Sequence, residues 1–334
     1  MNLPFTKMQG LGNDFVVLNA ANLNEFAGTQ TLHQWQEQAP LWAKALCDRH
    51  FGVGADGLIV LFDLNEKRSY KVPSFVHSYP GSEHAQFAWT YTNADGSWST
   101  MCGNGLRCAA LYLLERGLVD KHGFSLSTAA GSVPVRFLPE QMIETDFGSP
   151  VLDGAKIPSI WQEQKCVGVT LKVECFDTAY DLPVTAVNFG NPHCVIFDLV
   201  KGDQLKVLDR SDRENLEKLA VYIQTCGAFP EGVNVSFAEV VSRDKINLLV
   251  FERGCGWTLA CGSAAAATLV AGVLNEKVAK GCEIVLPGGS AYVSWGHDDR
   301  VKLSGPARAV FNGFLAVNTF AGGTLKASLR ETVS

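Results

Sequence analysis

The sequence has few charged residues and no cluster of one sign. Charged residues make up 19% of the 334 residues, below the share of roughly 25% that is typical of soluble domains. The net charge is −6, and no run of Lys and Arg with interleaved aromatic residues occurs. The electrostatic pattern of a nucleic-acid-binding protein is therefore missing. We expect the partner to be a small molecule and not a nucleic acid.

The patterns of secretion and membrane insertion are missing as well. Residues 1–7 lack the charged segment, apolar run and small-residue cleavage site of a signal peptide. The longest weakly polar stretch, 259–274, is shorter than the ~20 residues that a bilayer requires, and its composition predicts a buried helix. We expect a cytoplasmic protein that has no membrane partner.

The ten cysteines include no Cys-x-x-Cys pair, which argues against a zinc ribbon or a thioredoxin-type motif. In a cytosolic chain of this length they should be mostly reduced. Cysteine is among the most buried residue types, so most of these are expected to be packing residues. They are Cys47, Cys108, Cys166, Cys175, Cys194, Cys226, Cys255 and Cys282.

Cys102 and Cys261 differ from the others in their context. Each directly precedes small residues, Gly103-Asn104-Gly105 or Gly262-Ser263, and then an apolar run that is typical of a helix. A thiol at a helix N-terminus lies near unpaired N–H groups and the positive end of the helix dipole, which favour the thiolate. If both helices begin at one cavity, one thiolate could remove a proton from a carbon while the opposite thiol protonates its other face. Such a pair would invert a stereocentre.

The same plan appears twice along the chain. Gly12-Asn13-Asp14 is followed by Val53-Gly54-Ala55-Asp56, and Gly190-Asn191-Pro192 is followed at the same separation by Glu231-Gly232-Val233-Asn234. One of the two cysteines, an apolar run and a hairpin-like stretch come after each pair. This repetition predicts two homologous halves that face each other. The first half has extra residues, which fit in the loop 63–86.

Local patterns predict mostly sheet with a few helices. Residues 87–92 alternate large aromatic and small residues, as a half-buried strand does. Ser211 or Asp212 precedes apolar residues at helical spacing up to Ile223. The run after Cys261 is apolar on every side, which indicates a helix enclosed by a sheet.

Five segments of the chain resemble the diaminopimelate epimerase family, and the resemblance extends from Phe5 to about Gly313. Each segment alone is a weak signal, but their order together with both cysteines is highly specific. The segments are 7–15, 49–57, 93–108, 188–193 and 252–263.

The resemblance implies an α/β (α+β) fold of two pseudo-symmetric domains, each a mainly antiparallel sheet wrapped around a central helix. The active site would lie in the cleft between them. We expect the domains to span 1–144 and 145–307, with a strand at about 308–334 returning to the first. The implied activity is that of a cofactor-independent isomerase, without pyridoxal or metal, which interconverts L,L- and meso-diaminopimelate in lysine and peptidoglycan precursor biosynthesis. Relatives imply a homodimer.

The resemblance also assigns roles to residues. Cys102 would be the proton donor and Cys261 the acceptor in one direction, with His193 and Glu252 tuning the two thiols. Backbone N–H groups at the two helix starts suit the α-carboxylate, whereas amide side chains and a charge pair suit the distal amino-acid group. The implied substrate-binding residues are Asn13, Asn93, Gly103, Asn104, Asn191, Asn234, Glu252, Arg253, Gly262 and Ser263.

Three positions depart from the family pattern. Trp257 stands where Glu is common, Ala264 replaces a frequent Gly, and Trp98 replaces a common acidic residue. The tryptophans could reshape the pocket, so a racemase of another amino acid such as histidine is a second hypothesis.

Two hypotheses from different functional classes also fit the cysteine pattern. The protein could be a thiol redox or sensor protein, with a reversible disulfide between Cys102 and Cys261, or a non-catalytic ligand-binding module. Simpler interpretations exist for single residues as well. Asn13 and Asn191 could be turn residues, His193 a buried strand residue, and Glu252 and Arg253 an ordinary ion pair.

Overall fold

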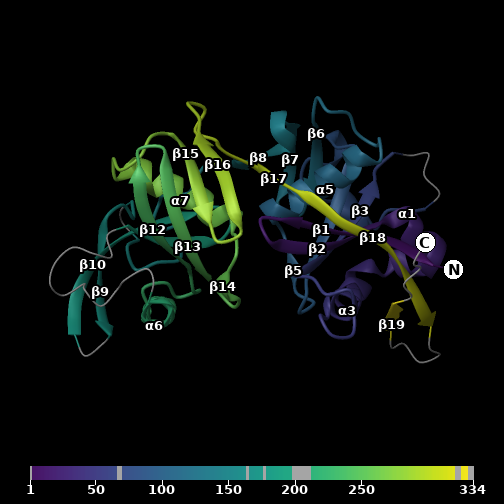
Figure 1. Cartoon of the computed structure of the whole chain (residues 1–334), viewed down its shortest axis with the longest axis horizontal. Helices are drawn as coiled ribbons and strands as arrows, with labels where there is room; N and C mark the ends of the chain where they lie inside the picture. The colour runs from purple at the N-terminus through teal and green to yellow at the C-terminus, as the bar shows by residue number, and fades with distance from the viewer. Residues whose placement is uncertain are drawn as a thin grey trace. The chain divides into compact units, whose positions relative to one another are not determined.

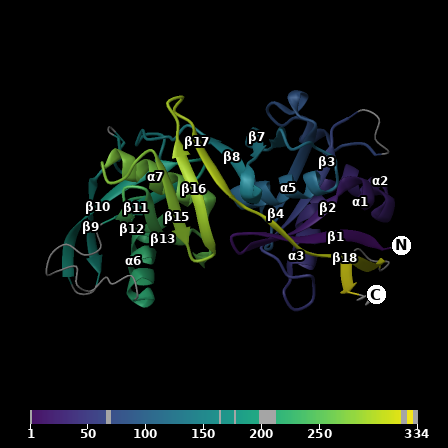
Figure 2. The ribbon, with the colours of Figure 1, turned by 45° about the horizontal axis from the view of Figure 1, so that its top comes forward.

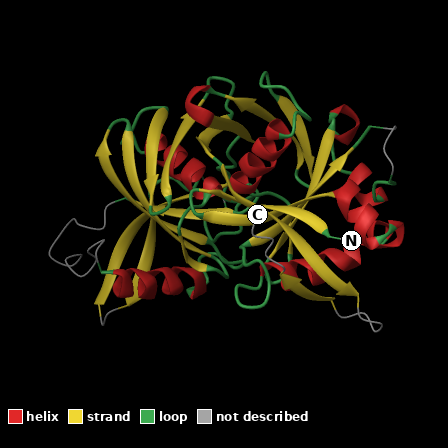
Figure 3. Cartoon of the chain, turned by 45° about the vertical axis from the view of Figure 1, so that its right-hand side comes forward, coloured by secondary structure: helices red, strands yellow, loops and turns green. Residues whose placement is uncertain are grey.

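The computed structural model describes residues 2–65, 70–162, 165–175, 178–197, 212–319 and 325–329 (Figure 1). The chain divides into unit 1, which is Met1–Thr145 with Gly305–Ser334, and unit 2, which is Asp146–Ser304. Strands hold more residues than helices in each unit, and the helices pack against the strands (Figure 3). None of the helices within these described ranges is long and apolar enough to cross a membrane.

The sheet of unit 1 begins with the antiparallel hairpin of β1 (Leu3–Gly10) and β2 (Asn13–Asn19). β2 lies parallel to β3 (Gly57–Asp63), and β3 pairs antiparallel with β4 (Phe87–Asn93). The starts of β2 and β3 and the end of β4 therefore share one edge of the sheet. β18 (Arg308–Thr319) pairs antiparallel with β1, so this late strand belongs to unit 1.

Among the remaining strands of unit 1, β5 lies between β4 and the central helix α5 (Gly103–Glu115) in the chain. The others come after α5. Short β5 pairs with the end of β4, β6 runs parallel to β4, and β7 and β8 continue antiparallel. β19 pairs with β18. These strands are β5 (Trp98–Ser99), β6 (Phe124–Thr128), β7 (Gly131–Phe137), β8 (Met142–Gly148) and β19 (Leu325–Leu329).

Alternation along the strands gives the sheet of unit 1 two apolar faces. Phe15 and Val17 belong to a buried cluster with α5, whereas Val16 and Leu18 belong to one with α3 (Trp35–Cys47). Successive side chains of a strand point to opposite faces, so one strand can serve both cores. α1 (Ala20–Ala27) and α2 (Thr29–His33) lead into α3. α5 is thus held against the sheet by apolar residues from several strands.

The extra loop of the first half, 63–86, contains two short helices, α4 (Ser74–His77) and η1 (Ser82–His84). Val72 and Val76 from this segment are buried in the cluster that includes α3. Residues 66–69 of the predicted loop lie outside the described residues. The short 3-10 helix η2 (Pro139–Gln141) precedes β8.

Unit 2 uses the same connections. β11 lies parallel to β12, β12 antiparallel to β13, and β13 parallel to β15. Short β14 pairs with the end of β13, and β16 pairs with β15. These strands are β11 (Pro192–Ile196), β12 (Asn234–Ser242), β13 (Lys245–Glu252), β14 (Gly256–Thr258), β15 (Gly281–Leu286) and β16 (Gly289–Trp295).

Two strands precede this series in unit 2 and one follows it. β9 pairs with β10, β10 pairs with β11, and β17 pairs with β16, each antiparallel. Their bounds are β9 (Val169–Cys175), β10 (Thr178–Asn188) and β17 (Val301–Pro306). The order β2, β3, β4, β5, α5, β6 and β7 thus recurs as β11, β12, β13, β14, α7, β15 and β16. The repeat that the motif spacing predicts is therefore also present in the order and pairing of the strands in the two units.

Two helices of unit 2 match sequence expectations (Figure 2). α7 (Gly262–Leu274) is buried from Ala264 to Gly272, as its apolar run predicts. α6 (Arg213–Thr225) is capped by Asp212, whose side chain accepts from the Asn215 N–H, and it buries an apolar stripe. Ser211, the other predicted cap, lies outside the described residues. The predicted fold class, a mainly antiparallel sheet around a central helix in each half, is confirmed.

Candidate active site

Cys102 is the N-cap residue of α5 and has extended backbone angles, φ −150° and ψ 110°. The Gly105 N–H donates to its Sγ at 3.4 Å, and the thiol donates to Oδ1 of Asn13 at 3.6 Å. The residue is partly exposed. Small residues after Cys102 let the backbone N–H reach the sulfur, which is the arrangement expected from the sequence.

Asn13 is brought to Cys102 by the tight turn between β1 and β2. Leu11 (φ 54°) and Gly12 (φ 84°) both have left-handed backbone angles, as in the two-residue turns that match strand twist. Nδ2 of Asn13 donates to Oδ2 of Asp56 at 2.7 Å, and the Asp14 N–H donates to the same oxygen at 3.1 Å. Asp56 directly precedes β3. Because β2 and β3 are parallel, the starts of the two strands lie side by side, and Asp56 lies next to Asn13 and Asp14.

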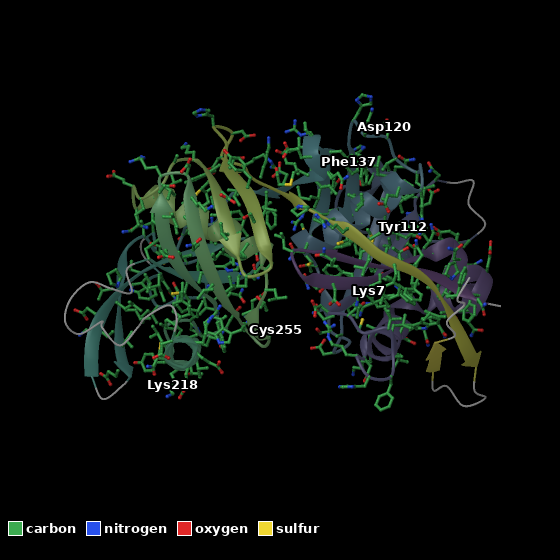
Figure 4. All side chains as sticks on the ribbon, viewed as in Figure 1. Lys7, Tyr112, Asp120, Phe137, Lys218 and Cys255 are labelled. Carbon is green, nitrogen blue, oxygen red and sulfur yellow. The ribbon has the colours of Figure 1, made fainter. Side chains whose placement is uncertain are left out.

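A cluster of four charged side chains supports this turn. Arg49 Nη2 lies 2.9 Å from Asp14 Oδ1 and 2.8 Å from Asp56 Oδ1. Lys7, labelled in Figure 4, lies 2.6 Å from Asp14 Oδ2 and also donates to the Gly54 carbonyl. Burial alone would raise the pKa of Asp14, but hydrogen bonds from Arg49 and Lys7 hold it below its usual value. These charged residues were not predicted to belong to the site, although they flank the two glycine turns of the first half.

Arg107 was also missed by sequence reasoning. This residue of α5 has a fully buried side chain. Its Nη2 donates to Asn104 Oδ1 at 2.6 Å, and its Nη1 donates to the Gly103 carbonyl at 3.3 Å. A Cβ at Gly305 would lie 3.1 Å from the guanidinium carbon, so a glycine there leaves room for it. Burial lowers the pKa of Arg107 to about 10, and it remains a cation at neutral pH.

Asn104 and Asn93 are two further residues of unit 1 that were predicted to bind the substrate. Asn104 lies in the first turn of α5, and its Nδ2 donates to Asn13 Oδ1 at 3.4 Å. Asn93 ends β4 at the same sheet edge, where its Nδ2 donates to Ser97 Oγ at 2.9 Å. Its described side-chain bond therefore closes its own turn.

In unit 2, Cys261 is the N-cap residue of α7, with φ −129° and ψ 116°. Its Sγ lies 3.4 Å from Ser263 Oγ, and the residue is only 8% exposed. Burial raises the pKa of the Cys261 thiol well above its usual value, and the negative charge of Glu252 raises it further. The Ser263 hydroxyl and the Ala264 N–H oppose this increase.

The other predicted residues of unit 2 gather at one sheet edge, because β11 and β12 begin where β13 ends. The Thr258 hydroxyl donates to Glu252 Oε1 at 2.6 Å. Oδ1 of Asn234 accepts from the Arg253 N–H at 2.9 Å, and the Arg253 guanidinium donates to the Glu231 carbonyl.

His193 lies beside Asn234 in the β11–β12 register. It is fully buried, and its Nε2 lies 3.1 Å from Asn191 Oδ1. Burial lowers the pKa of His193 to about 3, so the ring is neutral at neutral pH. Its described hydrogen bond is with Asn191, and its effect on a thiol stays a prediction.

The remaining cysteines divide into two groups. Five are buried as predicted: Cys47, Cys108, Cys166, Cys194 and Cys282. The prediction is wrong for Cys226 and Cys255, which are exposed, because Cys226 ends α6 and Cys255 lies in the β13–β14 hairpin (Figure 4). The side chain of Cys175 lies outside the described residues.

The two tryptophans occupy corresponding positions, each four residues before a cysteine. Trp257 packs on Phe251, with ring centroids 5.3 Å apart, and its Nε1 donates to Glu217 of α6 at 2.9 Å. Trp98 packs edge-on against Phe75 of α4 at 5.8 Å. Ala264 is buried in the first turn of α7. In the part of the chain that the structure describes, no three His, Cys, Asp or Glu side chains are grouped to hold a metal ion.

Comparison with known proteins agrees with this arrangement. A family model described as diaminopimelate epimerase matches residues 5–152 and 185–310. The chain belongs to the diaminopimelate epimerase family. A diaminopimelate epimerase of Synechococcus sp. (strain JA-3-3Ab) is 39% identical over 319 residues, 94% of this chain and 98% of that protein. One of Microcystis aeruginosa is 35% identical over 322 residues, 95% of this chain and 100% of that protein.

Solved structures share the fold of this epimerase family member at low sequence identity. A hydroxyproline epimerase from Agrobacterium vitis, with bound trans-4-hydroxy-L-proline, has a TM-score of 0.62 and 13% identity, and the match covers 97% of this chain and 95% of that one. A probable proline racemase from Agrobacterium radiobacter K84 has a TM-score of 0.62 and 12% identity, with 96% and 94% covered. The predicted family and the prediction of an isomerase are confirmed.

Proposed function

We propose that this protein is a diaminopimelate epimerase that interconverts L,L- and meso-diaminopimelate without a cofactor, in lysine and peptidoglycan precursor biosynthesis. One observation supports the proposal beyond family membership. Cys102 and Cys261 cap α5 and α7, the helices that correspond in the two halves of the repeat. Each thiol thus stands at the positive end of a buried helix.

The reaction requires removal of a weakly acidic α-proton. A carbanion forms next to the α-carboxylate, so donors fixed in advance on that carboxylate lower the barrier. The helix starts offer such donors in the backbone N–H groups of Gly103, Asn104, Gly262 and Ser263. They need no reorganisation during the reaction, because the helices themselves hold them.

The two thiols act on opposite faces of the α-carbon. In one direction Cys261 acts as its thiolate, which is the minor form of a thiol whose pKa is raised by burial. This thiolate takes the α-proton and becomes a thiol, while the Cys102 thiol gives its proton to the other face and becomes a thiolate. The α-carbon ends with inverted configuration, and no electron is gained or lost. The reverse reaction exchanges the two roles. This mechanism requires both sulfurs to reach the same α-carbon.

The distal amino-acid group of the substrate would be held by amides and charges. Asn234 and Arg253 are joined by a hydrogen bond, and Glu252 is adjacent in sequence. Together with Asn13, Asn93 and Asn191 they could bind one ammonium and one carboxylate.

The three departures from the family pattern, Trp98, Trp257 and Ala264, do not replace any of the proposed substrate-binding residues. The Trp257 indole is held by Phe251 and Glu217, and its ring lies under the guanidinium of Arg213 at 4.7 Å. These contacts direct it toward α6. This supports diaminopimelate as the substrate over another amino acid such as histidine, which no observation favours.

Assembly and location are further parts of the proposal. We infer a cytoplasmic homodimer, as for a biosynthetic enzyme of this family, and two folding domains near the limits expected from the sequence. Sedimentation velocity at several concentrations tests the dimer, since a monomer at all concentrations would contradict it.

The function is tested by incubating reduced protein with L,L-diaminopimelate and separating the stereoisomers by chiral chromatography. We expect meso product, and no conversion of L-histidine under the same conditions. Cys226→Ser is the matched control, because this exposed cysteine ends α6 and lies at neither helix start. Racemisation of histidine without formation of meso-diaminopimelate would overturn the assignment.

A further inference from the structure

Arg107 and Asp56 stand at opposite ends of a row of hydrogen-bonded side chains in unit 1. Arg107 Nη2 donates to Asn104 Oδ1 at 2.6 Å. Asn104 Nδ2 donates to Asn13 Oδ1 at 3.4 Å. Asn13 Nδ2 donates to Asp56 Oδ2 at 2.7 Å. We call these four residues the amide row.

The charged ends give the amide row one direction. The orientation of an Asn amide follows from its partners, because its oxygen and nitrogen are similar in size. A guanidinium only donates, so Asn104 must turn its oxygen to Arg107. An ionised carboxylate only accepts, so Asn13 must turn its NH2 group to Asp56. A flip of either amide would place two donors or two acceptors face to face.

This direction decides which atom of Asn13 faces Cys102. Its Oδ1 lies 3.6 Å from Sγ and accepts from the thiol. A carbonyl oxygen stabilises S–H and disfavours a thiolate, because it cannot donate a proton. The Gly105 N–H, at 3.4 Å from the same sulfur, has the opposite effect. The two contacts therefore have opposite effects on the thiol. The Asn13 oxygen favours the neutral S–H form, whereas the helix start alone would favour the thiolate.

We propose that the amide row sets the resting protonation state of Cys102, by presenting a carbonyl oxygen to its sulfur and keeping it a neutral thiol. Arg107 and Asp56 are positioning residues, since they act through Asn104 and Asn13. The consequence for catalysis rests on the proposed function: a thiol held in this way is ready to donate a proton. The state of the thiol itself can be measured without any substrate.

Several other groups of unit 1 could influence the same sulfur through their charge. They are the ion cluster of Lys7, Asp14, Arg49 and Asp56 around the β1–β2 turn, and Arg107 and Cys108 of α5, which interact electrostatically with Cys102. Asp14 provides a matched control. It carries the same charge as Asp56 in the same ion cluster, but in the described contacts it bonds to Lys7, Arg49 and the Asp56 N–H. Asp14→Asn removes a charge and leaves the amide row intact.

The test is the pH dependence of Cys102 alkylation by iodoacetamide in the full chain, followed by mass spectrometry. The tryptic peptide 72–107 contains Cys102 as its only cysteine. In Asp56→Asn the new amide can donate to Asn13, so a carboxylate no longer forces the NH2 group of Asn13 away from the sulfur. Only the longer contact of 3.4 Å with Asn104 Nδ2 then opposes a flip of Asn13. We expect the thiol pKa of Cys102 to fall by about one unit, the size of a hydrogen bond to a charged group. The shift should be smaller in Asp14→Asn.

Salt and a second variant separate hydrogen bonding from charge. The shift in Asp56→Asn should persist in about 0.5 M NaCl, where effects between exposed charges are screened. Asn13→Ala removes the carbonyl oxygen and leaves every charge of the ion cluster in place, so it should lower the Cys102 pKa even if Asp56→Asn does not fold. Equal shifts in Asp56→Asn and Asp14→Asn, or no decrease in Asn13→Ala, would overturn the proposal. Failure of the epimerase assay would not, because alkylation uses no substrate.

Discussion

The Thr258 hydroxyl donates a hydrogen bond of 2.6 Å to Oε1 of Glu252, and the charge of Glu252 raises the pKa of the Cys261 thiol. β13 and β14 create this contact, since Glu252 ends one strand and Thr258 ends the other. A short hydrogen bond fixes the orientation of a carboxylate. The β13–β14 hairpin thus holds a negative charge near a buried thiol.

Glu252→Gln should therefore lower the pKa of the Cys261 thiol. The variant loses the charge that favours the protonated sulfur, and a shift of about one unit is typical of such a neighbour. The pH dependence of Cys261 alkylation, resolved by tandem mass spectrometry, measures it. Thr258→Val keeps the charge and should shift the pKa less. Glu239→Gln is the charge control in β12, and a shift in this control as large as that in Glu252→Gln would contradict a local effect.

Trp257→Phe should destabilise unit 2 without affecting catalysis. The variant keeps an aromatic ring against Phe251 but loses the hydrogen bond to Glu217 and weakens the contact with Arg213. We expect a loss of roughly 1 kcal/mol in the free energy of unfolding, and less than about a twofold change in turnover.

Urea unfolding and steady-state kinetics measure the two effects of the Trp257→Phe exchange. Glu217→Gln should reproduce part of the stability loss, and the double variant should lose less than the sum of the two. A large fall in kcat would show instead that the indole borders the substrate.

His193 should make the protein sensitive to mild acid. Burial lowers its folded-state pKa from 6.5 to about 3, so between these values the unfolded chain binds a proton that the folded chain does not. Stability therefore falls as the pH drops below about 6.5, by up to ~1.4 kcal/mol per pH unit. His193→Gln removes this contribution to the pH dependence of the free energy of unfolding.

The acid sensitivity is measured by urea unfolding of both proteins between about pH 7 and pH 4.5. The variant should show the shallower pH dependence. His297→Gln serves as control, since this side chain is exposed in the folded protein. Equal slopes for His193→Gln and the unmodified protein would contradict a buried neutral ring.

The sequence was sufficient to predict the repeat, the two cysteine helices and the family. Regular apolar runs and fixed motif spacing determine these features, so they can be recognised without coordinates. α6 was also expected, because its apolar residues recur at helical spacing. Its acidic N-cap lies immediately before Arg213.

Long-range polar contacts could not be predicted. Arg107 lies in the second turn of α5, and an arginine would ordinarily be expected at a surface. It is buried because glycines at positions 10 and 305 leave space around its side chain, a fact that needs the β1 and β17 backbones. Likewise Asp56 reaches Asn13 only because β2 and β3 are parallel. Cys226 and Cys255 were misplaced because residue type alone does not specify burial at a helix end or in a turn.

The central claim, inversion by two thiols, is tested most directly in D2O. Reduced protein is incubated with L,L-diaminopimelate, and α-deuterium and meso product are followed together, with Cys102→Ser and Cys261→Ser alongside. We expect deuterated meso product from the unmodified protein and a loss of turnover of at least ~10²-fold in each variant, since each face of the carbon needs its own acid or base. Meso product without α-deuterium, or full activity in either folded variant, would contradict the two-thiol mechanism.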